Sequence, residues 1–198
     1  ERFLDHPERR RLLAMEPESE YQRNLIVFYG PIVNSGVMEA VYETILRLHG
    51  NLVIPASFVD VMNPAEAELI RRAVARGLYV SQHHVEPVGV SFFGFMSYWH
   101  RQGRSTQFSY PSERELFHRI WQDSIAKWHA LAGDKVLWQL GLRGRGDRAA
   151  WVTDPAFDRE KAGSYISDAL AAQVAAIRQV DRRPHPPMTL TLWLEMSQ

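Results

Sequence analysis

The segment from residue 83 to 87 places two histidines and a glutamate within four positions, in the order His83-His84-Val85-Glu86-Pro87. Imidazole and carboxyl groups so close in sequence suit proton transfer, contacts to a substrate hydroxyl or carboxylate, or metal binding. The spacing differs from the His-Glu-x-x-His zinc motif, and in an extended segment only His84 and Glu86 share a face. The pattern therefore favours a substrate or acid/base site over a metal site, with a solvated loop as the alternative.

A second cluster, residues 142–148, contains three arginines, one aspartate and two glycines. A guanidinium group such as that of Arg143 can bind a carboxylate through two parallel hydrogen bonds, while glycines allow the backbone to approach a ligand closely. The pattern matches neither Gly-x-Gly-x-x-Gly nor the P-loop, so it does not indicate a phosphate site. The tripeptide Arg145-Gly146-Asp147 would suit an adhesion loop, but such triplets arise by chance. A solvated turn is the other interpretation of this cluster.

Trp99 and Trp151 flank the two polar clusters. An indole ring there can stack on a sugar ring or fill the core, and both interpretations stay open.

The composition narrows the class of protein. The chain has 198 residues, 45% of them apolar, and its 23 basic and 23 acidic residues give a formal net charge of zero. This balance gives no electrostatic footprint for nucleic acid or anionic membranes, and the absence of cysteine excludes disulfides, iron–sulfur clusters and thiol catalysis. The apolar runs are far shorter than the roughly 20 residues of a membrane span. We expect a soluble chain whose location is left open, with a secreted or periplasmic parent as one alternative.

Short apolar runs alternate with helical patterns along the chain. Strands are predicted at 24–28, 51–56, 78–81 and 135–140, and helices at 34–50, 63–77, 112–133 and 157–180. The stretch 92–99 is ambiguous, and the tail 188–198 fits either a strand or the start of a helix.

This order of elements predicts an α/β fold of parallel strand-helix repeats, because parallel neighbours need a helical crossover. Polar clusters follow the strands, so they are expected together at the carboxyl ends of the sheet. A complete (β/α)8 barrel needs about 250 residues, which leaves room for about half of a TIM-type barrel or a small open sheet.

Three segments resemble, in order, motifs of glycoside hydrolase family 115, the α-glucuronidases that act on glucuronoxylan. Residues 41–51 followed by Ile54-Pro-Ala56 are similar to the family's Leu-Arg-Leu-Lys-Gly-Asn and Trp-Pro-Ala-Met-Trp segment. Residues 81–87 resemble its Ser-His-x-Glu-Pro stretch, and residues 140–147 resemble its Gly-Met-Arg-Gly-Asp-Gly-Asp loop. The resemblance runs from Tyr29 to Trp151 and more faintly to the end.

The resemblance implies that residues 1–198 are a single segment of a (β/α)8 barrel catalytic domain, truncated at both ends within a longer multidomain chain. The first residue, Glu1, agrees with a processed protein or a segment of a longer one. By motif, His84 and Glu86 would line a uronic-acid pocket, and Arg143 and Asp147 would contact the sugar or its carboxylate. The family's Trp-Pro-Ala-Met-Trp is here Ile54-Pro-Ala-Ser-Phe58, which marks a divergent relative.

The resulting hypothesis is a segment of a xylan α-1,2-glucuronidase-like hydrolase that releases a terminal uronic acid with inversion. Glu86 and Asp147 are the expected catalytic carboxyl groups, because inversion needs an acid and a base about 6.5–9.5 Å apart. Which of them is the acid is left open. The expected substrate-binding residues are His83, His84, Arg143, Arg145, Trp99 and Asn34.

No metal and no cofactor are expected, and the expected partners are a glucuronoxylan-type oligosaccharide and the remainder of a longer chain. Two alternatives stay open. One is a non-catalytic, carbohydrate-binding half-barrel, and the other is a structural fragment without independent activity.

Overall fold

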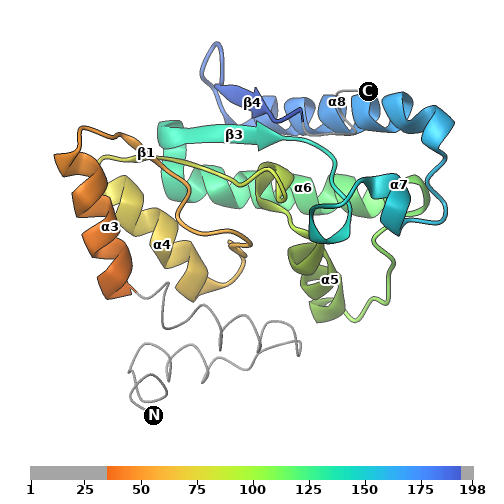
Figure 1. Cartoon of the computed structure of the whole chain (residues 1–198), viewed down its shortest axis with the longest axis horizontal. Helices are drawn as coiled ribbons and strands as arrows, with labels where there is room; N and C mark the ends of the chain where they lie inside the picture. The colour runs from red at the N-terminus through yellow and green to blue at the C-terminus, as the bar shows by residue number, and fades with distance from the viewer. Residues whose placement is uncertain (1–34, 193–198) are drawn as a thin grey trace.

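A computed structural model describes residues 35–192 of the chain (Figure 1). The helices and strands, in chain order, are α3 Ser35–Arg47, β1 Leu52–Val53, α4 Pro64–Ala75, β2 Tyr79–Ser81, α5 Phe92–Arg101, α6 Tyr110–Ala132, β3 Val136–Leu140, α7 Ala150–Thr153, α8 Ala162–Val180 and β4 Met188–Leu190. The strand predicted at 24–28 and the predicted binding residue Asn34 lie outside the described residues.

The four described strands form one sheet in the order β1-β2-β3-β4, and every neighbouring pair is parallel. Val53 lies beside Val80, Val80 beside Val136, and Trp138 beside Met188. Each strand therefore pairs with the next described strand along the chain, as in one arc of a (β/α)8 barrel. The prediction of a parallel α/β fold is confirmed, and the open sheet is consistent with part of a barrel.

Helices cover one face of the sheet. Every second residue along a strand points to that face, and these residues are apolar. Val80, Val136 and Trp138 are fully buried there. Helix α4 packs on β2, and α6 packs on β3 and along α8. In Figure 1, α4 and α6 lie below the strands in the view, and α7 lies beyond the arrowhead of β3. The polar loops at that end thus rest on a packed core.

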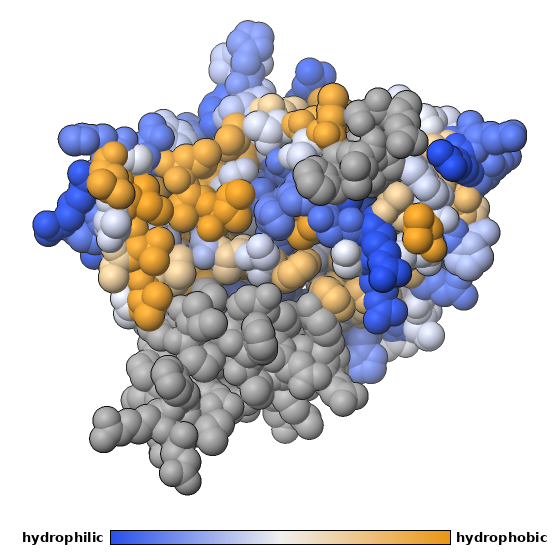
Figure 2. All heavy atoms as spheres, viewed as in Figure 1, coloured by the Kyte–Doolittle hydropathy of each residue, from blue (hydrophilic) through white to orange (hydrophobic). Residues whose placement is uncertain are grey.

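The opposite face carries partly exposed apolar side chains. Leu52 and Tyr79, which are register partners on β1 and β2, are both exposed, as is Ile54. Figure 2 shows hydrophobic atoms gathered over α3 and the first strands on this side. No helix in the part of the chain that the structure describes is both long and apolar enough to span a membrane.

Local capping explains where the helices begin. Asn63 caps α4 as predicted, since its Oδ1 accepts a hydrogen bond of 3.0 Å from the Ala65 N–H. Ser91 caps α5 in the same way through the Gly94 N–H, and this resolves the ambiguous stretch as a helix. Helix α6 begins two residues before the capping box predicted at Ser112, because Ser109 accepts from the Ser112 N–H instead.

The remaining boundaries differ modestly from the prediction. Helix α8 begins at Ala162 rather than Phe157, after a turn of 3-10 helix at Arg159–Lys161. The tail forms the three-residue strand β4, which pairs with β3.

Candidate functional site

The candidate site lies where β2 and β3 end. Residues 82–86 follow β2, and residues 141–148 follow β3. Because the two strands are parallel neighbours, both loops leave the same edge of the sheet. The contact between them is direct, since Nε2 of His84 lies 3.2 Å from Oδ2 of Asp147.

The loop after β3 is a tight turn that returns Asp147 toward Arg143. Gly146 and Asp147 both have a φ of 64°, a conformation that glycine adopts freely and aspartate tolerates. The Gly144 N–H donates to the Arg148 carbonyl at 2.8 Å and closes the turn. A Cβ at Gly144 would lie 2.6 Å from Oγ1 of Thr153, so glycine is needed for the close approach.

Arg143 lies beneath this turn and binds Asp147 on two atoms. Its Nε and Nη2 donate to Oδ1 of Asp147 at 3.1 and 2.7 Å, and Nη2 also donates to the Asp147 carbonyl at 2.7 Å. The Arg143 side chain is 3% exposed. The guanidinium is thus buried and bonded within its own loop, and a contact between Arg143 and a substrate carboxylate stays a prediction.

The two donors keep Asp147 ionised. Burial alone would raise the pKa of Asp147, but hydrogen bonds from His84 and Arg143 outweigh it and lower the pKa below its usual value. An ionised carboxylate only accepts, so the proton shared with His84 sits on His84 Nε2. The Asp147 side chain remains 35% exposed and is therefore an acceptor within reach of a ligand.

His83 extends the cluster. Its ring contacts the His84 ring with centroids 4.1 Å apart, and its Nδ1 lies 3.4 Å from Oγ of Ser57. Burial, helped by the charge of His84, lowers the pKa of His83, with Asp147 opposing. The imidazole is thus neutral at pH 7, where it can accept a proton.

The segment 83–86 is a turn rather than the extended chain that the face argument assumed. The Glu86 N–H donates to the His83 carbonyl at 2.9 Å. This curvature brings the two imidazoles together and directs Glu86 elsewhere. The expectation that His84 and Glu86 share one face, with His83 opposite, is therefore wrong.

Glu86 is turned into the protein. It is 1% exposed, and its Oε1 accepts from the His83 N–H at 3.1 Å. Burial raises the pKa of Glu86 to about 8, against the backbone N–H groups of His83, Phe58 and Val59, which favour the charged form. The structure thus brings together His84, Arg143 and Asp147, whereas Glu86 faces loop backbone. Its catalytic role stays a prediction.

The other predicted binding residues are divided. Trp99 is 3% exposed and packs edge-on against Tyr98, so it belongs to the aromatic core and its ring faces are closed to a sugar. The binding role given to Trp99 stays a prediction. Arg145 is exposed, and its guanidinium lies 5.0 Å from the centroid of the Phe92 ring.

Sequence reasoning missed Ser57 and Phe92. Ser57 directly follows the strand predicted at 51–56, and this position at a strand end was the available signal. Phe92 had no such signal, because its contact with Arg145 joins segments 53 positions apart.

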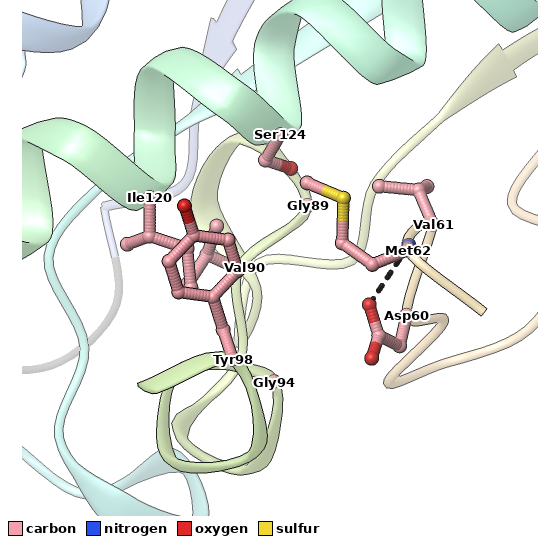
Figure 3. Close-up of a pocket in the computed structure, with 9 residues that line it drawn as sticks. All are labelled: Asp60, Val61, Met62, Gly89, Val90, Gly94, Tyr98, Ile120 and Ser124. Carbon is pink, nitrogen blue, oxygen red and sulfur yellow. Dashed lines mark hydrogen bonds between the residues drawn. The ribbon is translucent and has the colours of Figure 1, made fainter. Parts of the chain in front are cut away.

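A small cavity lies between α5, α6 and the segment after β1 (Figure 3). Its walls include Met62, Val90 and Ile120, and its volume is about 10 Å³, enough for no more than about one water molecule. It is a packing gap in the core. Within residues 35–192, no group of three or more His, Asp or Glu side chains is arranged to hold a metal ion.

Comparison with known proteins agrees with the motifs. Residues 18–198 match the family model described as Glycosyl hydrolase family 115. No curated protein matches the chain.

Proposed function

The chain belongs to glycosyl hydrolase family 115, and on this basis we propose that it forms part of the catalytic domain of a xylan α-1,2-glucuronidase-like enzyme. In this proposal the four parallel strands are about half of a (β/α)8 barrel, and the protein releases a terminal uronic acid with inversion. The observation that carries the proposal is the partly exposed Asp147 carboxylate, held between Arg143 and His84 at the carboxyl ends of β2 and β3.

The proposed reaction needs two carboxyl groups and one water molecule, without metal or cofactor. One carboxylate takes a proton from water, the water oxygen bonds to the anomeric carbon, and the glycosidic bond breaks as a carboxylic acid protonates the leaving oxygen. Asp147 is suited to the ionised role, because its pKa is lowered. It either activates the water or accepts from a sugar hydroxyl.

Glu86 has the protonation state of an acid at pH 7, since its pKa is raised to about 8. Its carboxyl group faces backbone, however, so we assign Glu86 to positioning the loop of His83. The acid then comes from a residue beyond those described. Arg143 likewise positions Asp147, which leaves the exposed Arg145 and Arg148, on the same loop, as the cations proposed for the uronate.

The test compares the full natural chain with its Asp147→Asn variant on an aryl α-uronide and on a xylo-oligosaccharide bearing uronic acid. We expect a 10²- to 10⁴-fold loss of kcat, the range of roughly a hundred to ten thousand that general acid–base groups supply. NMR of the first product anomer checks inversion. Asp158→Asn is the matched control, because Asp158 lies on the turn before α8 and pairs with Lys161.

Full activity of Asp147→Asn would overturn the assignment. Binding of the oligosaccharide without hydrolysis would favour the non-catalytic half-barrel. Neither binding nor hydrolysis would favour a structural fragment.

A further inference from the structure

The loop that carries Arg143 and Asp147 begins at Gly141, directly after β3. Leu140, the last residue of β3, lies in register with Leu190, the last residue of β4, so the paired part of these two strands ends there. Gly141 is buried, and buried backbone N–H and C=O groups need hydrogen-bond partners. The point where the loop leaves the sheet therefore depends on a partner from outside the strands.

Helix α8 supplies that partner through Gln173. Its Nε2 donates to the Gly141 carbonyl at 2.7 Å, and its Oε1 accepts from the Gly141 N–H at 3.1 Å. One side-chain amide thus binds both backbone groups of Gly141, as a residue of a neighbouring strand would. Gln173 is 0% exposed, so solvent does not compete for either bond.

A glutamine is an unusual residue at this position of α8. The other buried residues of the helix, Ala169, Ala176 and Ile177, lie at the spacing of one apolar stripe, and position 173 continues that stripe. An apolar side chain would fill the core there, whereas a buried amide is costly unless its polar atoms are bonded. Both polar atoms of Gln173 bind Gly141, so the polarity of this side chain serves one backbone position.

The position of Gly141 matters because the two site loops approach each other closely. A Cβ at Gly141 would lie 3.3 Å from Cγ of Pro87, which belongs to the loop after β2. Further along its own loop, Asp147 is held by Arg143. The contact of 3.2 Å between Asp147 Oδ2 and His84 Nε2 crosses from one loop to the other. This second contact therefore depends on how the two loops are aligned.

We propose that Gln173 is a positioning residue of the candidate site, which holds Gly141 and so aligns the loop after β3 with the loop after β2. The alignment keeps Asp147 against His84. Gln173 acts through the backbone of Gly141, so removing its amide should change the surroundings of Asp147 while every group of the site stays present. The effect of Gln173 on turnover rests on the proposed function, whereas its effect on Asp147 does not.

The direct test is an NMR titration of the Asp147 carboxyl group in the full natural chain and in its Gln173→Met variant. Methionine has a side chain of similar length without an amide. In the natural chain, hydrogen bonds from His84 and Arg143 lower the pKa of Asp147. When the loops lose their alignment, the bond from His84 is lost while Arg143, on the same loop, stays bonded. The pKa of Asp147 should then rise part of the way back to its usual value of 3.8.

Tyr42→Phe is the matched control. Tyr42 is fully buried, and its hydroxyl donates to the Leu69 carbonyl at 3.0 Å, between α3 and α4 rather than at a site loop. Its loss should lower the free energy of unfolding, as the loss of a buried hydrogen bond does, but leave the titration of Asp147 unchanged. An equal change of Asp147 in both variants would mean that a general loosening of the core moves it, and would overturn the proposal.

Turnover of an aryl uronide gives a second readout. Gln173→Met should lower kcat about a hundredfold, the loss expected when a catalytic group is misplaced by about 1 Å, and change KM by less than about threefold. Tyr42→Phe should keep both constants.

Gln173→Glu should rescue the site in a way that depends on pH. A neutral carboxylic acid both donates and accepts, so it can replace the two bonds to Gly141, whereas a carboxylate only accepts. The ratio of its kcat to that of the natural chain should be near one at low pH and fall as the new carboxyl group ionises. The NMR signal of the Asp147 carboxyl group should shift over the same pH range.

An unchanged titration of Asp147 in Gln173→Met overturns the proposal, whether or not the natural chain hydrolyses uronides. A raised pKa of Asp147 in a chain that hydrolyses no uronide supports the positioning role, and only the proposed function then fails. If Gln173→Met does not fold, Gln173→Glu decides. An Asp147 signal that stays in place while the new carboxyl group ionises overturns the proposal, and a signal that shifts supports it.

Discussion

The loops that follow β2 and β3 carry carboxyl groups with opposite properties. In the β3 loop, hydrogen bonds from His84 and Arg143 overcome burial and lower the pKa of Asp147. In the β2 loop, burial dominates and raises the pKa of Glu86 to about 8. The two residues occupy similar places in consecutive strand-helix units. Their surroundings, rather than the strand that precedes them, therefore decide which one is offered to a ligand.

The difference has a simple physical source. Asp147 has a buried cation beneath it, whereas Glu86 receives backbone N–H groups and the influence of another buried acid, Glu66. Glu66 accepts from the Asp60 N–H at 2.7 Å and from Asn63 Nδ2 at 3.0 Å, and burial raises its pKa to about 7. The Asp147 carboxylate thus faces outward and is held by the Arg143 cation. Glu66 and Glu86 instead bind groups of the loops after β1 and β2.

The largest expected effect comes from removing the cation. Arg143→Ala deletes three hydrogen bonds and leaves a partly buried Asp147 without its charge partner. We expect a loss of about 3 kcal/mol in the free energy of unfolding, toward the low end for broken buried pairs because Asp147 keeps His84 and some solvent. Urea denaturation measures this. Arg143→Lys should recover part of the loss, since it restores the charge but not the two-pronged geometry.

The Arg143→Ala variant also tests whether Arg143 positions Asp147 or contacts the substrate. If Arg143 acts by positioning Asp147, Arg143→Ala should lower kcat/KM equally on a uronide and on the matching neutral glycoside. A loss confined to the uronide would show that Arg143 meets the substrate carboxylate and would contradict the geometry described above.

Glu86 should respond less, and in a way that depends on the replacement. Glu86→Ala leaves the His83 N–H without its acceptor and opens a hole, so we expect a loss of about 2 kcal/mol in the free energy of unfolding. Glu86→Gln keeps the shape and an acceptor oxygen, and it resembles the protonated acid present at pH 7. Glu86→Gln should therefore lower the free energy of unfolding by less than about 1 kcal/mol. A larger cost for Glu86→Gln than for Glu86→Ala would show that the charged form is the native one.

The free energy of unfolding should depend on pH in opposite directions through Glu86 and Asp147. The pKa of Glu86 is raised in the folded state, so its stabilising contribution is complete below about pH 4.5 and is lost as the pH rises toward about 8. The slope is at most about 1.4 kcal/mol per pH unit for one group. The pKa of Asp147 is lowered, so its contribution is present above about pH 3.8 and is lost as the pH falls below that value.

Urea denaturation between pH 5 and about 8 therefore separates the contribution of Glu86 to stability from that of Asp147. Glu86→Gln should flatten the decline, and adding Glu66→Gln should flatten it further, because the pKa of Glu66 is also raised. Asp147→Asn should keep the part of the decline that Glu86→Gln removes, because the Asp147 carboxyl itself titrates below this window. An unaltered decline in Glu86→Gln would refute the inward-facing, protonated Glu86.

The fold was largely predictable because its signals are local. Alternating short apolar runs and helical patterns give the parallel strand-helix order, and caps such as Asn63 fix the helix starts. The prediction of a (β/α)8 barrel goes beyond these local signals. The described strands form an open parallel sheet, which is consistent with part of such a barrel. Proximity of the two polar loops also followed, because parallel neighbours end at one edge.

Side-chain direction at the site was not predictable in the same way. A turn instead of an extended segment at 83–86 reversed the faces expected for His83 and Glu86, and periodicity carries no information about such a turn. The sequence predicts a substrate contact for Arg143, because no local pattern shows that Asp147 folds back over it. The sequence leaves two roles open for Trp99, stacking on a sugar or filling the core, and only the tertiary contact with Tyr98 distinguishes them.

The smallest expected effect concerns the link between the two regions. Ser57 follows β1 and lies 3.4 Å from Nδ1 of His83, at the long end of the hydrogen-bond range and near solvent. Ser57→Ala should therefore change the free energy of unfolding by less than about 0.5 kcal/mol, as exposed substitutions do. If Ser57 only orients the His83 ring, its removal should shift the NMR titration of His83 while the signals of the Asp147 side chain stay in place. A shift of both would mean that the three loops titrate as one unit and that the inward and outward carboxyl groups are coupled through the two histidines.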